Sequence, residues 1–218
     1  MSIARGLVGW WRFDGNLTDA SGNGNHATVF SGSNGYAPGI YGQARDYGGG
    51  GDNVLLGKSP WGADNKFTIS AWIKTGATTA NRSLFGASND GGTTAIIVQT
   101  NRVVAGNGRL WFFLRKDSGS NFSLETETGA HPNFEWFFLT VTNDEENMRI
   151  YVNAVLVAQG ATPAGDLADL TYGFGLGFHD NRGAVSNDFT GQIDNALIEK
   201  YARTPSEIKN LYALGSPL

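Results

Sequence analysis

The sequence predicts an all-β protein in which short strands form a two-sheet sandwich, with one short helix near the C-terminus. Three observations lead to this prediction. Apolar and polar residues alternate, strand-length segments recur between turn residues, and glycine is abundant, at 31 of 218 residues. Alternation with a period of two is typical of a strand that buries one face. Because the glycines have no every-third-residue period and prolines number only 6, they indicate many tight turns rather than a collagen-like repeat.

The clearest strand is expected at residues 67–74. Its apolar positions share one face: Phe67, Ile69, Ala71 and Ile73. Residues 134–159 predict a meander, because the polar segment 143–147 has hairpin length and Asn153-Ala154 can form a second turn. Further strands are expected at 5–13, 43–47, 53–57, 82–88, 93–100, 109–116, 121–127, 171–178 and 187–200. This spacing is that of a sandwich, and no linker divides the chain, so residues 1–218 are predicted to form a single domain.

One helix is expected to begin after Thr204. Thr204 is suited to be its N-cap, Pro205 its first residue, and Glu207 the partner that closes a capping box. Apolar residues follow on one face at helical spacing: Ile208, Leu211 and Tyr212. Gly215 can end the helix.

Composition excludes several classes of function. The formal charge of −4 argues against a strongly basic nucleic-acid clamp. The absence of cysteine excludes disulfides, thiolate metal sites and cysteine nucleophiles. Apolar runs stop at about five residues, far short of the roughly 20 that cross a bilayer. No nucleic acid and no membrane insertion are therefore expected.

Motifs for phosphate binding and for catalysis are incomplete. Gly57-Lys58-Ser59 resembles the end of a P-loop, but Asp52 stands where the first glycine is needed. Glu125 and Glu127 are the nearest approach to the paired carboxylates of sandwich glucanases. We interpret these two glutamates as solvated carboxylates on an edge strand, and we expect no enzymatic activity. The alternating glycines within residues 173–178 are expected to leave one strand face bare for close packing or for a ligand.

The most informative segment lies near the N-terminus and reads Trp11-Arg12-Phe13-Asp14-Gly15-Asn16-Leu17-Thr18-Asp19-Ala20-Ser21-Gly22-Asn23-Gly24-Asn25-His26-Ala27. It resembles the opening motif of laminin-G-like domains in the concanavalin-A-like lectin/glucanase superfamily. Further landmarks of that family follow in order, at residues 42–47, 67–74, 149–157, 189–198 and 204–212. The resemblance covers most of the chain and implies a two-sheet antiparallel jelly-roll sandwich. Such domains are commonly non-catalytic, bind glycans or proteins, and often hold one calcium ion.

Two departures from the family pattern fall in the scaffold. Ala154 stands where the family usually has glycine after Tyr-Val-Asn, and Glu135-Trp136-Phe137-Phe138 replaces the usual Trp-His-His. Neither departure changes the expected fold.

Residues 14–26 offer the hard oxygen ligands that calcium prefers, in a glycine-rich loop whose carbonyls can turn inward. The candidate side chains of this loop are Asp14, Asn16, Asp19, Asn23 and Asn25. The family resemblance would bring Asp194 beside them. We expect a structural calcium ion held by Asp14 and Asp194, with Asn16, Asp19 or Asn25 assisting. The alternative is that these residues only form turns.

Glycan recognition needs an aromatic ring that stacks on a sugar, surrounded by polar side chains for the hydroxyls. Trp111, with Arg109 and Arg115 on the same strand face, is one candidate platform. The polar segment His179-Asp180-Asn181-Arg182 is another. The alternative is that each tryptophan belongs to the core, as most do in a sandwich.

Three hypotheses for function follow: a binding or adhesion module that recognises a glycan, a structural protein of a particle, and a glycoside-cleaving enzyme. The first two combine in the favoured interpretation, a non-catalytic, virion-displayed phage accessory protein. It would be a capsid decoration or fibre component whose partners are capsid or fibre subunits and surface glycans. It is favoured because one domain fills a chain that begins at Met1 without a signal-peptide pattern. A virion protein reaches the outside of the cell by lysis and needs no such signal, so the expected location is extracellular or on the virion surface. The alternative is a carbohydrate-binding module from a secreted bacterial polysaccharide-degrading enzyme. The third, a glycoside-cleaving enzyme, is disfavoured by the missing carboxylates.

Overall fold

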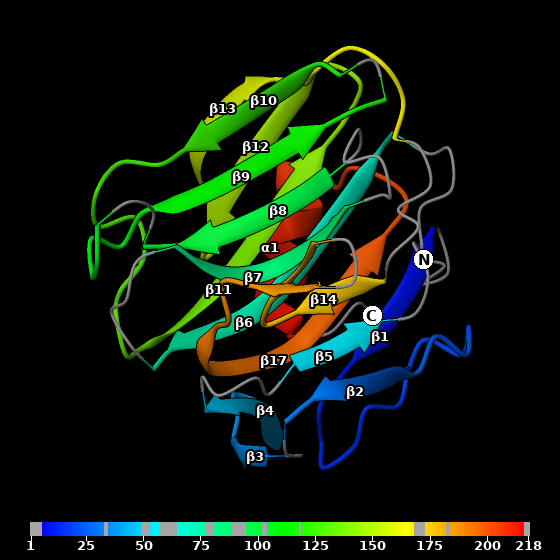
Figure 1. Ribbon diagram of the computed structural model, residues 1–218, viewed down its shortest axis with the longest axis vertical. Helices are drawn as coiled ribbons and strands as arrows, with labels where there is room; N and C mark the ends of the chain where they lie inside the picture. Colours follow the sequence, from blue (N-terminus) through cyan, green and yellow to red (C-terminus); the bar gives the residue numbers. More distant parts are fainter. Residues whose placement is uncertain are drawn as a thin grey trace.

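Two β-sheets pack face to face, and one helix covers the outside of the sheet at the rear of Figure 1. We name the two layers the front sheet and the back sheet after this view. The computed structural model describes residues 6–32, 35–48, 53–56, 65–76, 81–88, 95–101, 104–117, 119–167, 173–181 and 184–215, without the side chains of 180, 181 and 184–186. The P-loop-like segment 57–59 lies outside the described residues.

The back sheet has eight strands in the described part of the chain. These are β1 (Leu7–Trp11), β3 (Gly35–Pro38), β4 (Gln43–Gly48), β6 (Phe67–Thr75), β11 (Trp136–Asn143), β12 (Asn147–Val152), β13 (Val155–Ala161) and β17 (Thr190–Glu199). Their order is β13-β12-β11-β6-β17-β4-β3, and β1 also pairs with β17. All of these pairings are antiparallel.

The front sheet has nine strands among the described residues. These are β2 (Ala27–Ser31), β5 (Asn53–Leu56), β7 (Arg82–Ser88), β8 (Ala95–Thr100), β9 (Leu110–Arg115), β10 (Asn121–Glu125), β14 (Phe174–Leu176), β15 (His179–Asn181) and β16 (Ala184–Ser186). The main order is β10-β9-β8-β7-β14-β5-β2. β15 pairs with β16 and makes one parallel bridge to β7, whereas the other pairings are antiparallel. The predicted two-sheet jelly-roll sandwich is confirmed.

The core lies between the sheets and follows the alternation of the sequence. Phe67, Ile69, Ala71 and Ile73 are all buried in it, as their spacing on β6 predicts. Phe67 meets Phe112 of the front sheet edge to face, with ring centroids 6.1 Å apart. The opposite face of β6 is also buried at Trp72, because the helix lies over it.

The helix α1 (Pro205–Leu214) forms as its sequence predicts. Thr204 is the N-cap, and its reciprocal hydrogen bonds with Glu207 complete a capping box. Gly215 ends the helix in the left-handed conformation, with φ of 64°. The apolar face packs on the outer side of the back sheet, where Tyr212 lies 5.5 Å from Trp72 between ring centroids.

Two local predictions are confirmed by backbone geometry. Asn153 and Ala154 have φ of 50° and 63° and form the turn between β12 and β13, which explains why the family prefers glycine at the second position. Gly173, Gly175 and Gly177 permit close packing, because a Cβ at each would lie within 3 Å of Leu55, Phe178 or Tyr47 respectively.

Within the described residues, no helix has the length and apolarity needed to span a bilayer.

Four described strands were not predicted from the sequence: β2, β3, β15 and β16. Each has five residues or fewer. Their pairing with neighbouring strands, rather than a long alternating pattern of their own, defines them.

Candidate functional site

The outer face of β9 carries a continuous row of aromatic and cationic side chains. Leu110, Phe112 and Leu114 point into the core, so the residues between them point outward. The rings of Trp111 and Phe113 stack with centroids 5.2 Å apart and an interplanar angle of 22°. We call the outward set Arg109, Trp111, Phe113 and Arg115 the aromatic row.

The two arginines of the aromatic row are positioned by their neighbours. The guanidinium of Arg115 lies 5.2 Å from the centroid of the Phe113 ring. Arg109 Nη1 donates to Glu125 Oε1 at 3.0 Å, and Arg109 Nε donates to Thr128 Oγ1 at 3.2 Å. The structure therefore places the predicted platform residues Arg109, Trp111 and Arg115 on one face.

Strands on both sides of β9 supply polar residues to the same face. On β10, Glu125 is opposite Trp111, Ser123 is opposite Phe113 and Asn121 is opposite Arg115. On β8, Gln99 is opposite Trp111, and its Nε2 donates to Ser83 Oγ at 3.2 Å. The three β10 side chains are exposed, as expected of an edge strand. Glu125 is thus part of the rim of the aromatic row.

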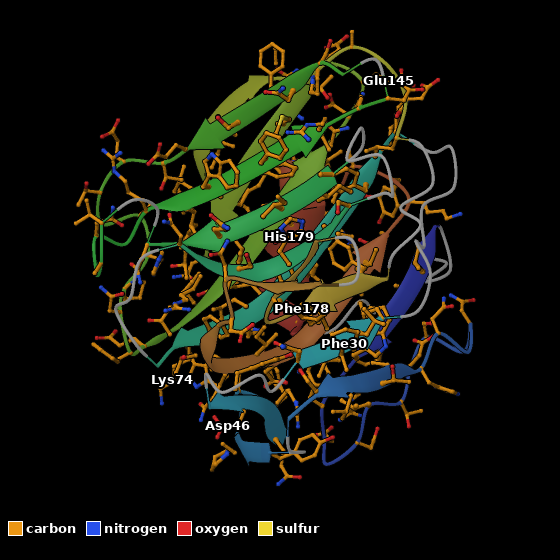
Figure 2. The ribbon with its side chains drawn as sticks, viewed as in Figure 1. Phe30, Asp46, Lys74, Glu145, Phe178 and His179 are labelled. Atoms are coloured by element: carbon orange, nitrogen blue, oxygen red, sulfur yellow. The ribbon has the colours of Figure 1, made fainter. Side chains whose placement is uncertain are left out.

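His179 also lies on the front sheet, but it is buried. It packs over Gly86 of β7, where a Cβ would come within 3.1 Å of the His179 Cβ, and Figure 2 shows it near the centre of the sheet. Burial lowers the pKa of His179 to about 4, so the ring is neutral at physiological pH. Within the described part of the chain, its Nε2 has no hydrogen-bond partner. Asp180 and Asn181 follow it in β15, but their side chains are not among those that the structure describes. Arg182 lies outside the described residues.

The two predicted ligand segments are separated by two strands. The sheet order from β9 to β15 passes through β8 and β7. At a strand spacing of about 4.8 Å, the segments lie on the order of 14 Å apart across the sheet. They therefore do not form one compact site at the level of their strands.

The structure brings the two carboxylates of the predicted calcium site to the same turn, between β3 and β4. Asp194 Oδ2 accepts hydrogen bonds from the amides of Ile40 at 2.8 Å and Tyr41 at 3.0 Å. Asp14 Oδ1 accepts from the Gln43 amide at 3.0 Å. The side chain of Asp194 is buried, whereas that of Asp14 is partly exposed and forms an ion pair with Arg12 at 2.8 Å.

The electrostatics of Asp194 reflect this position. Burial raises the pKa of its carboxyl from 3.8 to about 6, and the nearby charge of Asp14 acts in the same direction. The amides of Tyr41 and Ile40 act in the opposite direction, because they stabilise the ionised form. Ionising Asp194 therefore costs more free energy than ionising a solvated aspartate, and a bound cation would offset this cost.

Two glycines make this approach of the carboxylates feasible. A Cβ at Gly39 would lie 2.5 Å from Asp194 Oδ2, and a Cβ at Gly42 would lie 2.1 Å from Asp14 Oδ1. Gly42 also has φ of 69°. This turn was not predicted from the sequence, although the dipeptide Pro38-Gly39 is a turn signal.

The other predicted calcium ligands organise the N-terminal loop. Asp19 Oδ1 accepts from the amides of Trp10 and Ser21, at 3.0 and 2.8 Å, and its Oδ2 accepts from the Asn25 amide at 3.0 Å. Although burial opposes ionisation, these bonds hold the pKa of Asp19 below its usual value. Asn25 Nδ2 donates to the Val8 carbonyl at 2.7 Å. This group thus ties the loop to β1.

Asn16 and Asn23 complete the loop. Asn16 Nδ2 donates to the main-chain carbonyl of Asp14 at 3.1 Å, and Asn23 Nδ2 donates to the Leu7 carbonyl at 2.7 Å. Among the described residues, no three or more His, Cys, Asp or Glu side chains gather to hold a metal ion. A calcium ion at Asp14 and Asp194 would therefore take its remaining ligands from carbonyl and amide oxygens.

Comparison with protein families gives one match. A family model described as "Concanavalin A-like lectin/glucanases superfamily" matches residues 48–209, which is well over half of the chain. No curated protein sequence matches significantly.

Solved structures share the fold at low sequence identity. Domain 4 of AbnA, a GH43 extracellular arabinanase from Geobacillus stearothermophilus in complex with arabinotriose, has a TM-score of 0.76 and 22% identity, over 94% of this chain and 98% of that one. The binding domain of Paraclostridial Mosquitocidal Protein 1 has a TM-score of 0.77 and 15% identity, over 97% of this chain and 52% of that one. The botulinum neurotoxin serotype D binding domain has a TM-score of 0.70 and 17% identity, over 96% and 51%. The chain thus spans about half of each toxin binding domain.

Proposed function

The chain belongs to the concanavalin A-like lectin/glucanase superfamily, and we propose that it is a non-catalytic module that binds a glycan on the outer face of its front sheet. The observation that carries the proposal is the aromatic row on β9, with its polar rim on β10. Aromatic rings stack on the apolar faces of sugars, while charged and amide groups around them hydrogen-bond to hydroxyls.

The aromatic row is also rigid before a ligand arrives. Phe112 and Leu114, which alternate with it, are completely buried. Strands on both sides fix the backbone of β9. Because little side-chain or backbone freedom remains to be lost, binding on this face would cost little conformational entropy.

A purely binding role fits the charges on this face. Glycoside hydrolysis ordinarily uses two carboxyl groups, about 5–5.5 Å apart in retaining enzymes. The aromatic row and the rim residues named above include one carboxylate, Glu125, and it is ion-paired with Arg109. We therefore expect glycans to bind without being shortened.

We propose an extracellular polysaccharide as the ligand and a polysaccharide-degrading enzyme as the setting of the module. The supporting observation is the similarity to a domain of an extracellular arabinanase, which makes arabinan oligosaccharides the first ligands to test. The virion setting, with capsid or fibre subunits as partners, gains no support from the comparisons and stays a prediction.

Isothermal titration calorimetry with arabinotriose and a panel of plant and bacterial polysaccharides tests the proposal. Trp111→Ala should weaken binding at least about tenfold, which corresponds to roughly 1.4 kcal/mol. Phe122→Ala is the matched control, because Phe122 is an exposed aromatic residue on the adjacent strand whose partner, Leu114, is a core residue. Saturable binding that survives in Trp111→Ala would place the glycan elsewhere. Absence of binding across the panel would refute the lectin role.

We also propose that Asp14 and Asp194 hold a structural calcium ion. The donor set fits the ion, because two carboxylates converge on one turn and Asp194 is buried with a raised pKa. Asp14 is ion-paired with Arg12, whereas none of the ion pairs among the described residues includes Asp194. Calcium would supply the positive charge beside Asp194. Its expected effect is to fix the turn between β3 and β4 against the N-terminal loop, with no part in chemistry.

A further inference from the structure

A hollow lies on the back sheet, whereas the aromatic row belongs to the front sheet. Its volume is about 290 Å³. The residues that line it include Asp46, Lys74, Thr75, Phe134, Thr190 and Gln192. Figure 2 shows Lys74 and Asp46 near one another at the lower left edge of the molecule, whereas His179 marks the front sheet near the centre.

Three polar side chains form the floor of this hollow on three neighbouring strands. Gln192 of β17 is directly opposite Lys74 of β6 on one side and Asp46 of β4 on the other. Their neighbours Ile73 and Ile193 point into the core, so Lys74 and Gln192 point outward. A cation, an amide and an anion thus stand in one row, with Cβ atoms of opposite residues about 5 Å apart.

The hydrogen-bonding capacity of this row is largely unused. Gln192 Oε1 is buried and has no hydrogen-bond partner among the described residues. Across the described residues, the side chains of Lys74 and Asp46 also form no hydrogen bond or ion pair. Buried polar groups are normally paired, so an unpaired acceptor at the base of a hollow indicates a place where a ligand donor would fit.

The aromatic residue Phe134 also lines the hollow. Phe134 is 55% exposed, although phenylalanine is normally buried. Its backbone has φ of 65°, which is rare for a bulky residue, and its amide donates to Thr75 Oγ1 at 3.1 Å. The fold therefore holds an apolar ring outward beside the polar floor, at the cost of backbone strain.

We propose that this hollow is a second saccharide site, which takes a single neutral sugar ring. Phe134 stacks on the apolar face of the ring, Lys74 donates to a hydroxyl or ring oxygen, and Asp46 and Gln192 accept from hydroxyls. Lys74 and Asp46 carry opposite charges on either side of Gln192. Because these two charges sum to zero, the floor matches a neutral polyol better than an acidic or a basic sugar. The volume is at the lower end of the range for ligand pockets, which fits one ring rather than a long chain.

This inference does not rest on the proposed function of the aromatic row, since the two sites lie on different sheets. The experiment that tests it is a heteronuclear NMR titration of the whole protein, in calcium, with arabinose, galactose and glucose. Galacturonate and galactosamine serve as the charged comparisons. For at least one neutral sugar, the backbone amides of Thr75, Thr190 and Gln192 should shift in a saturable way, and the two charged sugars should shift them less.

Two isosteric variants locate the contacts. Lys74→Met and Asp46→Asn should each weaken the response at these amides at least fivefold, whereas Lys209→Met on the exposed face of α1 and Trp111→Ala should leave it unchanged. Shifts confined to β9 and β10 would overturn the second site while supporting the first. Unmoved amides with every sugar, a stronger response to either charged sugar, or a response that both floor variants retain would also overturn it. If one variant misfolds, the wild-type titration and the other variant still decide.

Discussion

Asp194 is a buried carboxylate whose ionisation is coupled to the turn that it holds. Its Oδ2 accepts two amide hydrogen bonds, from Ile40 and Tyr41, and its Oδ1 accepts from Asn195 Nδ2 at 3.1 Å. Burial nevertheless dominates and raises its pKa to about 6. A carboxyl whose pKa is raised in the folded state stabilises the fold most when protonated, and this contribution is lost as pH rises through the folded pKa.

Calcium should reverse this loss, because the ion binds the ionised carboxylate. We predict that the melting temperature in millimolar calcium exceeds that in chelator by several degrees at about pH 8, and that the difference shrinks below about pH 5. Differential scanning fluorimetry at both pH values, with and without calcium, measures the effect. Taking the difference between paired samples removes the other titrating groups, such as Asp19, from the comparison.

The matched variant is Asp194→Asn, which keeps the side-chain volume and removes the charge. It should abolish both the calcium effect and its pH dependence. A calcium effect of equal size at both pH values would contradict the role given to Asp194. No effect at either pH would remove calcium from the site altogether.

The residues of the candidate sites differ in how far the sequence could predict them. Arg109, Trp111 and Arg115 could be predicted to share a face from alternation alone. The pairing of Asp14 with Asp194 came from the family resemblance, because no local pattern relates residues so distant in sequence. The floor of the hollow on the back sheet was not predicted, since Asp46, Lys74 and Gln192 become neighbours only through long-range strand pairing.

At the scale of elements, α1 is the segment whose sequence and structure agree most closely. The cap, the first-turn proline, the apolar face and the C-terminal glycine are all local features. Glu207 Oε2 accepts from the Thr204 amide at 2.7 Å, and Thr204 Oγ1 accepts from the Glu207 amide at 3.4 Å. Local hydrogen bonds of this kind can be predicted from sequence, because they need no knowledge of the rest of the fold.

Removing the cap should weaken the whole domain, because α1 covers Trp72 on the back sheet. We predict that Thr204→Ala lowers the free energy of unfolding by about 1 kcal/mol. Urea denaturation followed by tryptophan fluorescence measures the change. Thr204→Ser keeps the capping oxygen and Lys209→Ala alters an exposed helix position, so both should remain near the wild-type midpoint. Equal midpoints for all three variants would show that the cap does not limit stability.

The short edge elements could not be predicted in the same way. β2 and β3 have five and four residues, and β3 ends in Pro38, which cannot donate to a sheet. Their strand character depends on β5 and β4, which present partners at the sheet edges. β15 and β16 likewise depend on each other and on one bridge to β7. Propensity within three to five residues is too weak to reveal such strands.

The back sheet joins distant parts of the chain. β1 near the N-terminus pairs with β17, which begins at Thr190, and β17 also lies between β6 and β4. A strand close to the C-terminus therefore occupies the middle of the sheet (Figure 1). Sheets that depend on such distant pairings fold slowly, because the entropy of closing long loops must be overcome first.

We therefore predict that the domain refolds with a rate constant on the order of 1 s⁻¹ or lower, in the slow range of β proteins. Stopped-flow tryptophan fluorescence after dilution from urea measures this rate. A variant that ends at Asp188, before β17 and α1, should lack a cooperative unfolding transition in near-ultraviolet circular dichroism. Cooperative unfolding of that shortened chain would show that the remaining strands form a core by themselves.

The placement of the two proposed saccharide sites on separate sheets has a mechanical consequence. The aromatic row faces outward from one layer of the sandwich, and the Asp46–Lys74–Gln192 floor faces outward from the other. The two layers are packed about 10 Å apart, and the side chains on their outer faces add to that separation. One polysaccharide strand cannot readily reach both faces, so a domain with both sites filled becomes a cross-link between two strands. In a solution of such polymers, a monomeric protein of this design would raise viscosity and promote a gel.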